Sequence, residues 1–287
     1  MQEDHGQRLL KPQATKLDMK HPGMLTLAQT AKNFVQDTFP SLWLQWHLAY
    51  RPRTAEAELA LLDRLVHPGD VTVDIGANLG LYTRELARLS RKVHAFEPSP
   101  QMANLLRRTS AAHVTVHEMA LSDRAGRAEL LIPRSQNRLI HSLASLERHA
   151  EAHAEEVAAQ PVPMSKLDAV IDEDISFVKI DIEGHEISVL NGARNTLAIS
   201  QPVFLVEAEE RHRSGATHHV MRFFHEQGYR GYFLADGKVL SAEAFDPHAL
   251  QNPDALLPDG QRKEGRVYVN NFFFFPAAQD GIAILKG

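Results

Sequence analysis

A glycine-containing loop near residue 76 is the first part of the chain with residue types suited to ligand binding. Residues 74–80 read Asp-Ile-Gly-Ala-Asn-Leu-Gly and follow the β-branched segment that begins at Val71. Gly76 and Gly80 let the backbone turn sharply and approach a ligand closely, because glycine has no Cβ. The helix expected after the loop offers free N–H groups to polar ligand atoms. Such a loop also occurs as a simple packing turn, so a second signal is needed.

Glu97 supplies that second signal. It ends the apolar segment 92–96 and lies 97 − 76 = 21 residues beyond Gly76. At this spacing in a βαβ unit, a carboxylate accepts hydrogen bonds from both ribose hydroxyls of an adenosyl cofactor. The alternative is a solvated acid at the end of a strand. The combination of the loop and the spacing favours ribose binding.

The loop composition discriminates between adenosyl cofactors. A dinucleotide-binding loop requires Gly-x-Gly-x-x-Gly, in which the second glycine makes room for pyrophosphate. Asn78 occupies that position here, and Asp74 precedes the loop. A carboxylate is unfavourable beside a phosphate but suits the amino group of a methionine moiety. The loop therefore favours S-adenosyl-L-methionine over NAD.

A second acidic block follows the apolar segment 177–180. It reads Asp-Ile-Glu-Gly-His-Glu over residues 181–186. In an open α/β sheet, ligands bind at the carboxyl ends of the strands where the strand order switches. We expect Asp74 and Asp181 to face each other across the cofactor, with Glu183 nearby, because carboxylates attract a sulfonium cation. Burial or helix capping is the alternative role for these acids.

Apolar and amphipathic segments alternate along the chain in a way that predicts the elements carrying these residues. We expect strands at residues 71–75, 92–96, 113–120, 177–180 and 202–208 and helices at 81–89, 101–109, 166–171, 186–197 and 218–227. Further candidate strands are 128–132, 231–234, 239–240 and 267–275. Strands alternating with helices predict βαβ units and a parallel sheet.

The ends and one internal stretch depart from this alternation. Residues 1–22 are polar and predict a flexible leader, and residues 23–67 predict an N-terminal helical cap. Residues 124–163 predict an insertion near the site, partly helical or mobile over residues 137–159. We expect one domain over residues 23–287, because the sequence contains no clear linker.

Composition excludes several classes of function. The chain of 287 residues is 44% hydrophobic and 23% charged, with a net charge of −5 and no cysteine. This balance argues against bulk nucleic-acid binding and excludes disulfides and thiolate metal sites. No apolar stretch is long enough for membrane insertion, and the N-terminus lacks a signal-peptide pattern. We expect a cytoplasmic protein. A homodimer is the oligomeric state expected in general, because it is the commonest one among soluble oligomers.

Six blocks carry a resemblance to a known family. VTVDIGANLGLYTRELA, VHAFEPSP, MALSDRAG, KLDAV, FVKIDIEGHEISVLNGA and PVFLVEAEE occur in this order between Glu56 and Glu210. Together they resemble the FkbM family of methyltransferases, with looser agreement at the later NNFFFFP segment. The resemblance implies a Rossmann-like, seven-stranded (class I) methyltransferase sheet flanked by helices, with S-adenosyl-L-methionine as the methyl donor. It also implies transfer to oxygen on a sugar or a secondary metabolite.

The resemblance further implies roles for individual residues. Four loop residues would line the methionine and ribose end of the cofactor: Asp74, Gly76, Asn78 and Gly80. Glu97 would hold the ribose, and Ser122 with Asp123 would lie near the adenine amino group. For Asp123, a simple turn role before Gly126 stays open.

Removal of the acceptor proton requires a base or a metal ion. Candidate bases are His185, Glu183, His141 and His212; His185, beside Asp181, is the best placed, although members of the family often carry alanine there. A second set of residues could bind Mg²⁺, namely Asp181, Glu207, Glu209 and His212. No spacing typical of a metal site supports this set, so we expect no obligatory metal.

Three alternatives to methyl transfer to oxygen remain. The first is an NAD-dependent oxidoreductase, disfavoured by Asn78 and by the acidic block at residues 181–186. The second is a non-catalytic protein that binds an adenosyl cofactor, disfavoured by the presence of Asp74, Glu97 and Asp181. The third is methylation of nitrogen, for which the expected Pro-Pro-Tyr type block is missing. Candidate acceptors are a hydroxyl of a polysaccharide, of a lipopolysaccharide, of a glycosylated metabolite or of another small molecule.

Overall fold

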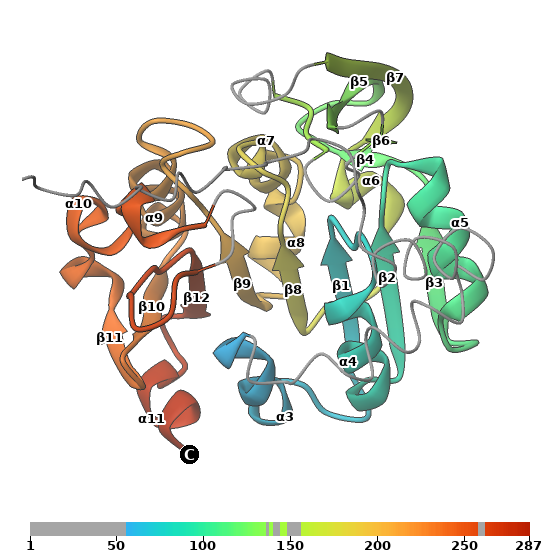
Figure 1. Cartoon of the computed structure of the whole chain (residues 1–287). Coiled ribbons are helices and arrows are strands. Elements are labelled where there is room, and N and C mark those ends of the chain that lie inside the picture. Colours follow the sequence, from blue (N-terminus) through green and yellow to red (C-terminus); the bar gives the residue numbers. More distant parts are fainter. Residues whose placement is uncertain (1–55, 136–137, 140–143, 148–155, 258–261) are drawn as a thin grey trace, which may run out of the picture. The chain divides into compact units, whose positions relative to one another are not determined.

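The computed structural model describes residues 56–135, 138–139, 144–147, 156–257 and 262–287 (Figure 1). All of them belong to one compact unit. The expected leader over residues 1–22 and the helices expected before residue 56 lie outside the described residues.

The main sheet contains five parallel strands at its centre and on one side. Their order is β3-β2-β1-β8-β9, and each neighbouring pair is parallel. The expected neighbourhood of the first strand and the strand before the acidic block is confirmed. The five strands are β1 (Val71–Ile75), β2 (Lys92–Phe96), β3 (Val114–His117), β8 (Phe177–Ile180) and β9 (Val203–Glu207).

The other side of the sheet adds three antiparallel strands, which makes eight where we expected seven. Beyond β9 follow β12 (Asn271–Pro276), β10 (Tyr229–Ala235) and β11 (Lys238–Ser241). Strand β11 contains the candidate strand expected over residues 239–240 and is joined to β10 by the two-residue turn Asp236-Gly237, with φ of 48° and 71°. An Asp-Gly pair accepts these positive φ values and therefore favours a tight hairpin.

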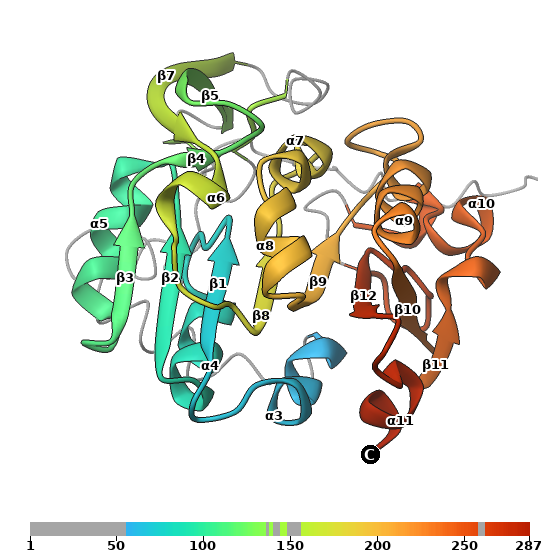
Figure 2. The same ribbon diagram turned by 180° about the vertical axis from the view of Figure 1, so that it is seen from behind.

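Two apolar cores cover the two faces of this sheet. Strand β12 shows the division, because Phe272 and Phe274 belong to one core and Phe273 and Phe275 to the other. The first core packs against α7 (Glu186–Asn191), α8 (Arg194–Ile199) and α9 (Ala216–Glu226) (Figure 2). The second packs against α3 (Leu62–Leu65), α4 (Leu81–Leu89) and α11 (Gly281–Lys286). Successive side chains of a strand point to opposite faces, which explains why four consecutive phenylalanines are all buried.

The expected single helix over residues 186–197 is two short helices, α7 and α8. They meet near Gly192, where a Cβ would lie 2.0 Å from the carbonyl oxygen of Ser122. The chain therefore passes close to another backbone segment at the point where the helix is interrupted. The remaining helices are η2 (Ala57–Leu61), α5 (Pro100–Thr109), α6 (Leu167–Val170), η5 (Ala242–Ala244), α10 (Pro247–Leu250) and η6 (Pro253–Ala255).

A second, four-stranded sheet lies at the carboxyl ends of the central strands (Figure 1). Its order is β4 (Ala120–Leu121), β7 (Glu156–Ser165), β5 (Gly126–Ser135) and β6 (Arg138–Leu139). The strand expected over residues 113–120 is thus divided between the two sheets. The described part of the stretch expected to be partly helical or mobile instead contributes strand residues, because β5 and β7 pair over nearly their whole length and bury a small apolar cluster of their own.

Candidate functional site

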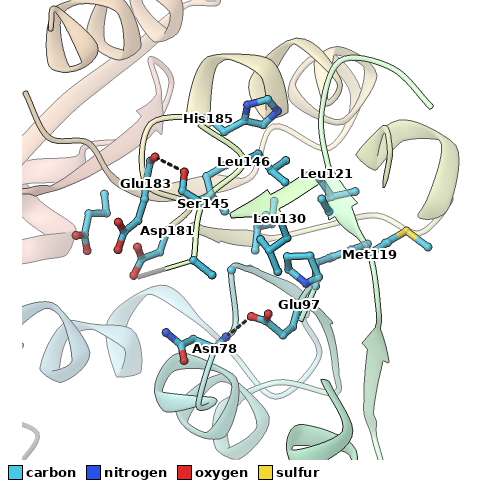
Figure 3. A pocket seen from close by; sticks show the side chains of 18 residues that line it. Asn78, Glu97, Met119, Leu121, Leu130, Ser145, Leu146, Asp181, Glu183 and His185 are labelled. Atoms are coloured by element: carbon cyan, nitrogen blue, oxygen red, sulfur yellow. Dashed lines mark hydrogen bonds between the residues drawn. The ribbon is translucent and has the colours of Figure 1, made fainter. Parts of the chain in front are cut away.

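A pocket of about 280 Å³ lies where the two sheets meet (Figure 3). Residues that follow β1, β2 and β8 form its floor and one wall, and residues of β4, β5 and the segment 144–146 form the opposite wall. The lining residues are Ile75, Gly76, Asn78, Phe96, Glu97, Pro98, Met119, Ala120, Leu121, Leu130, Ala144, Ser145, Leu146, Asp181, Ile182, Glu183, His185 and Glu207. The pocket therefore occupies the carboxyl ends of the strands at the switch in strand order, as the sequence predicted.

The two glycines of the loop serve close packing. Gly76 has a φ of +81°, and a Cβ there would lie 1.8 Å from the carbonyl oxygen of Asp181. The loop after β1 thus rests directly on the end of β8. Gly80, with a φ of +83°, precedes α4, and its Cβ would lie 2.6 Å from a methyl carbon of Leu106. Only Gly76 of the two lines the pocket.

Glu97 and Asn78 form one polar corner of the pocket (Figure 3). One carboxylate oxygen of Glu97 accepts the N–H of Asn78 at 2.9 Å and the other accepts the N–H of Ser99 at 2.8 Å. A carboxylate has about four acceptor positions, so Glu97 retains capacity for further donors. The side-chain Oδ1 of Asn78 is buried and has no hydrogen-bond partner among the described residues. This corner therefore lacks hydrogen-bond donors that a ligand could supply.

Burial governs the protonation of Glu97. Removal from water raises the pKa of its carboxyl to about 7, although the two backbone N–H groups oppose this rise. Asp74 also contributes, since its negative charge disfavours a second one. A ligand that brings positive charge or donors to this corner would favour the ionised form.

Asp74 itself lies beneath the loop. Its side chain accepts a hydrogen bond from the hydroxyl of Thr83 at 2.5 Å and is 2% exposed. Burial raises the pKa of Asp74 to about 6. Of the two aspartates expected to face each other, Asp181 reaches the pocket wall and Asp74 does not.

Lys179, a buried lysine that is absent from the residues predicted for the site, lies behind Asp181. The ammonium group of Lys179 is 3.8 Å from Asp181 Oδ2 and 3.0 Å from Asn271 Oδ1, with the side chain buried. Burial lowers the pKa of Lys179, but the surrounding acids, Asp181 first and then Glu207, outweigh this effect and raise the pKa above its usual value. In the sequence, a buried charge at this position is indicated only by the presence of a lysine in the otherwise apolar strand segment Phe-Val-Lys-Ile.

The second polar corner contains Glu183. Its backbone φ is 49°, in the left-handed region, and its carbonyl oxygen accepts a hydrogen bond from the hydroxyl of Ser145 at 3.0 Å (Figure 3). Burial raises the pKa of its carboxyl to about 7. Among the described residues, the basic side chain within ion-pair distance of this carboxylate is His212, whose Nδ1 is 3.5 Å from Glu183 Oε2. His212 itself is absent from the pocket wall.

His185, a candidate base, is engaged on both ring nitrogens. Nδ1 lies 2.8 Å from Glu147 Oε1, and Nε2 lies 3.0 Å from the hydroxyl of Ser122. These bonds tie the segment 144–147 to the body of the fold. Ser122 is buried and outside the pocket lining, and Asp123 is half-exposed and also outside it. The candidate base His141 lies outside the described residues.

Glu209, one of the acids considered for a metal site, is bound by other side chains. Glu209 accepts two hydrogen bonds from Arg211, at 2.5 and 2.9 Å, and one from the Tyr268 hydroxyl at 2.5 Å. Within the described part of the chain, no group of three or more histidine and acidic side chains is arranged to hold a metal ion. In the same residues, no helix is both long and apolar enough to cross a bilayer.

Comparison with known proteins identifies the family. The family model described as the methyltransferase FkbM domain matches residues 74–230, which include the glycine loop, Glu97 and the acidic block. The chain belongs to the FkbM methyltransferase family. A search of curated proteins gives no match.

Solved structures similar to this FkbM methyltransferase are distant. Methyltransferase FkbM from Methylobacillus flagellatus KT is 17% identical with a TM-score of 0.43, over 85% of this chain and 60% of that one. This chain thus spans 60% of the length of that protein. Precorrin-6y C5,15-methyltransferase from Geobacter metallireducens GS-15 is 14% identical with a TM-score of 0.41, over 76% and 86% of the two chains. A SAM dependent methyltransferase from Aquifex aeolicus is 14% identical with a TM-score of 0.39, over 70% and 95%.

Proposed function

We propose that this FkbM methyltransferase transfers the methyl group of S-adenosyl-L-methionine to a hydroxyl oxygen of a sugar or secondary metabolite. The observation that carries the proposal is the distribution of polar groups in the pocket. Glu97 and Asn78, whose Oδ1 has no partner in the described part of the chain, lie at one end, and the carboxylates of Asp181, Glu183 and Glu207 line the other.

The pocket residues fit an adenosyl cofactor. Glu97 has acceptor capacity for ribose hydroxyls, and Asn78 Oδ1 receives no hydrogen bond from any described residue. Apolar side chains of Met119, Leu130 and Leu146 offer a surface of the kind on which an adenine ring packs. The acidic end is favourable for a sulfonium and an ammonium group, since opposite charges attract strongly where water is excluded.

The bound cofactor would supply a methyl group already activated by a positively charged sulfur. The chain then has three tasks, namely to align the acceptor oxygen, to exclude water and to accept a proton. Glu183 is our proposed proton acceptor, because it lines the pocket and its pKa of about 7 suits a base near neutral pH. We assign Asp181 to the positively charged end of the cofactor, and His185 to holding the segment 144–147 over the pocket.

Calorimetric titration tests the cofactor assignment. We expect wild-type protein to bind S-adenosylmethionine and S-adenosylhomocysteine, and Glu97→Ala to bind both at least about tenfold more weakly, because the ribose loses a charged acceptor. Glu226→Ala, an exposed glutamate on α9, is the matched control and should bind like wild type.

Two results would contradict the assignment. Binding of NAD in place of both methionine derivatives would favour the oxidoreductase alternative. Unchanged affinity in Glu97→Ala would remove Glu97 from the ribose site. Incubation with deuterated methyl donor and hydroxyl-bearing or amine-bearing acceptors, followed by mass spectrometry, then separates oxygen from nitrogen transfer, and absence of any product would favour a non-catalytic binding protein.

A further inference from the structure

A row of charged side chains leads from the pocket into the protein behind Glu183. The Glu183 carboxylate lies 3.5 Å from Nδ1 of His212. On the other side of the same ring, Nε2 lies 3.7 Å from Glu209 Oε1. The Nε2 atom is buried and has no hydrogen-bond partner among the described residues. His212 therefore stands between a carboxylate that lines the pocket and one that is wholly buried.

Glu209 is a fixed anion at the inner end of this row. Its side chain is 0% exposed and is bound by Arg211, by the Tyr268 hydroxyl and, at 3.3 Å, by the amide of Asn270. Burial raises the pKa of Glu209, but His212 first and then Arg211 and Glu207 outweigh this effect and hold the pKa well below its usual value. A fixed anion on one side of the ring favours the imidazolium form of His212.

The backbone directs the outer end of the row. Glu183 has a φ of 49° and Gly184 has a φ of 101°, so two successive residues adopt left-handed backbone. Such a conformation is strained for a non-glycine residue and persists where the surroundings hold it. Ser145 holds it here by donating to the Glu183 carbonyl oxygen at 3.0 Å. The turn aims the Glu183 carboxylate at the pocket and at His212 simultaneously.

We propose that His212 is a positioning residue that keeps Glu183 ionised and oriented as the proton acceptor for the methylated hydroxyl. This inference rests on the proposed methyl transfer. As the acceptor oxygen bonds to the methyl carbon, the carbon–sulfur bond breaks with its electron pair remaining on sulfur, and the hydroxyl proton passes to a carboxylate oxygen of Glu183. One positive and one negative charge disappear together, so the net charge of the buried site does not change.

The other charged groups around the pair are consistent with this role. After burial, His212 has the largest effect on the Glu183 carboxyl and lowers its pKa, as Arg211 also does, while Asp181 and Glu209 raise it. Burial lowers the pKa of His212, but Glu209 and Glu183 outweigh this effect and raise it above the ordinary value, with Arg211 opposing them.

Two neighbouring carboxyls have other partners. Glu186 accepts the N–H of Gly184 at 2.7 Å, and Glu147 is bound to His185 at 2.8 Å. Neither faces Glu183 as His212 does, so the histidine is the group whose removal should change the ionisation of Glu183 most.

Carbon-13 NMR of glutamate side-chain carboxyls tests the pair directly in the full chain. The Glu183 signal is assigned by its loss in Glu183→Gln and is titrated between pH 4 and 10. In His212→Gln we expect its midpoint to rise by about one pH unit or more, because an opposite charge within reach is lost. His225→Gln, an exposed histidine on α9, should leave the midpoint unchanged. An unchanged midpoint in His212→Gln would overturn the proposal.

A reciprocal titration covers the case in which His212→Gln does not fold. The His212 ring is titrated in wild type and in Glu183→Gln, where its midpoint should fall because the same pair energy is removed from the other side. An unchanged imidazole midpoint would equally overturn the proposal. Calorimetry with S-adenosylmethionine on the same samples tests the proposed function separately, since the pair can titrate as expected in a protein that fails to bind the cofactor.

Discussion

At the scale of single residues, the pocket depends on positions where a side chain or its absence is dictated by a close neighbour. Gly76 brings the loop after β1 onto the backbone of Asp181, and Asn78 adopts a φ of 48° so that its N–H meets Glu97. The loop is therefore a packed joint between two strand ends as well as a candidate binding surface. A change at Gly76 should disturb the fold and the pocket together.

We expect Gly76→Ala to lower the free energy of unfolding by at least about 2 kcal/mol, because alanine is strained at a φ of +81° and its Cβ would lie 1.8 Å from Asp181 O. Urea unfolding measures the loss. Gly69→Ala is the control, since no atom lies within 4 Å of its added Cβ. Equal stability of the two variants would contradict the packing role of Gly76.

At the scale of elements, a polar chain connects β2 and β3 beneath the pocket. His94 on β2 contacts His117 on β3 at 3.0 Å and Glu173 at 3.0 Å. The His117 ring stacks on Phe96, with centroids 4.4 Å apart, and Phe96 lines the pocket. The edge of the parallel sheet thus supports the pocket through two histidines that must remain largely neutral.

Acid should weaken this edge. Burial lowers the pKa of His117 to about 4, from an ordinary value of 6.5, and also lowers that of His94. Because the pKa of His117 is lower in the folded state than in the unfolded state, neutral His117 contributes its full stabilisation above pH 6.5. This stabilisation is lost as the pH falls towards 4. We expect the stability difference between wild type and His117→Gln to shrink by about 1 kcal/mol from pH 7.5 to 4.5, allowing for solvent screening. Urea unfolding at both pH values checks this, and a difference independent of pH would contradict it.

At the scale of the whole molecule, the ends of β2, β8 and β9 bring acidic groups from distant parts of the chain to one pocket. Among the described residues that line the pocket, four carry carboxyls, namely Glu97, Asp181, Glu183 and Glu207. No lysine or arginine is found among these lining residues. Burial of these acids raises the pKa of Glu97 and of Glu183 to about 7. The pocket is therefore partly protonated near neutral pH and is suited to a cationic ligand.

Binding of a cation should release protons from this pocket. At pH 6.5, below the pKa of about 7, Glu97 and Glu183 are largely protonated, and a positive ligand favours their ionised forms. We expect S-adenosylmethionine to release more protons than S-adenosylhomocysteine, whose sulfur is neutral, and its affinity to rise with pH up to about 7.5. Calorimetry in buffers of different ionisation enthalpy measures the release. Equal release by both ligands would show that the sulfonium charge is not sensed by these acids.

Short-range rules in the sequence account for the elements that carry the site. The alternation of strands and helices, the glycine loop, the position of Glu97 after β2 and the acidic block after β8 all follow from local periodicity and turn chemistry. The family follows from the same segments, which lie within the matched residues 74–230. Local rules predicted the structure less well in two places. Residues 113–120 divide between two sheets, and Gly192 interrupts a helix where another backbone segment passes close by.

The pairing of side chains in and around the pocket follows from tertiary packing. Lys179 beneath Asp181, His212 between Glu183 and Glu209, and the second sheet over the pocket depend on contacts between segments far apart in the chain. No periodicity encodes such contacts, because they follow from how the strands order and how their loops pack. The same packing places Asp74 beneath the loop and Asp181 at the pocket wall, two aspartates that the sequence alone could not tell apart.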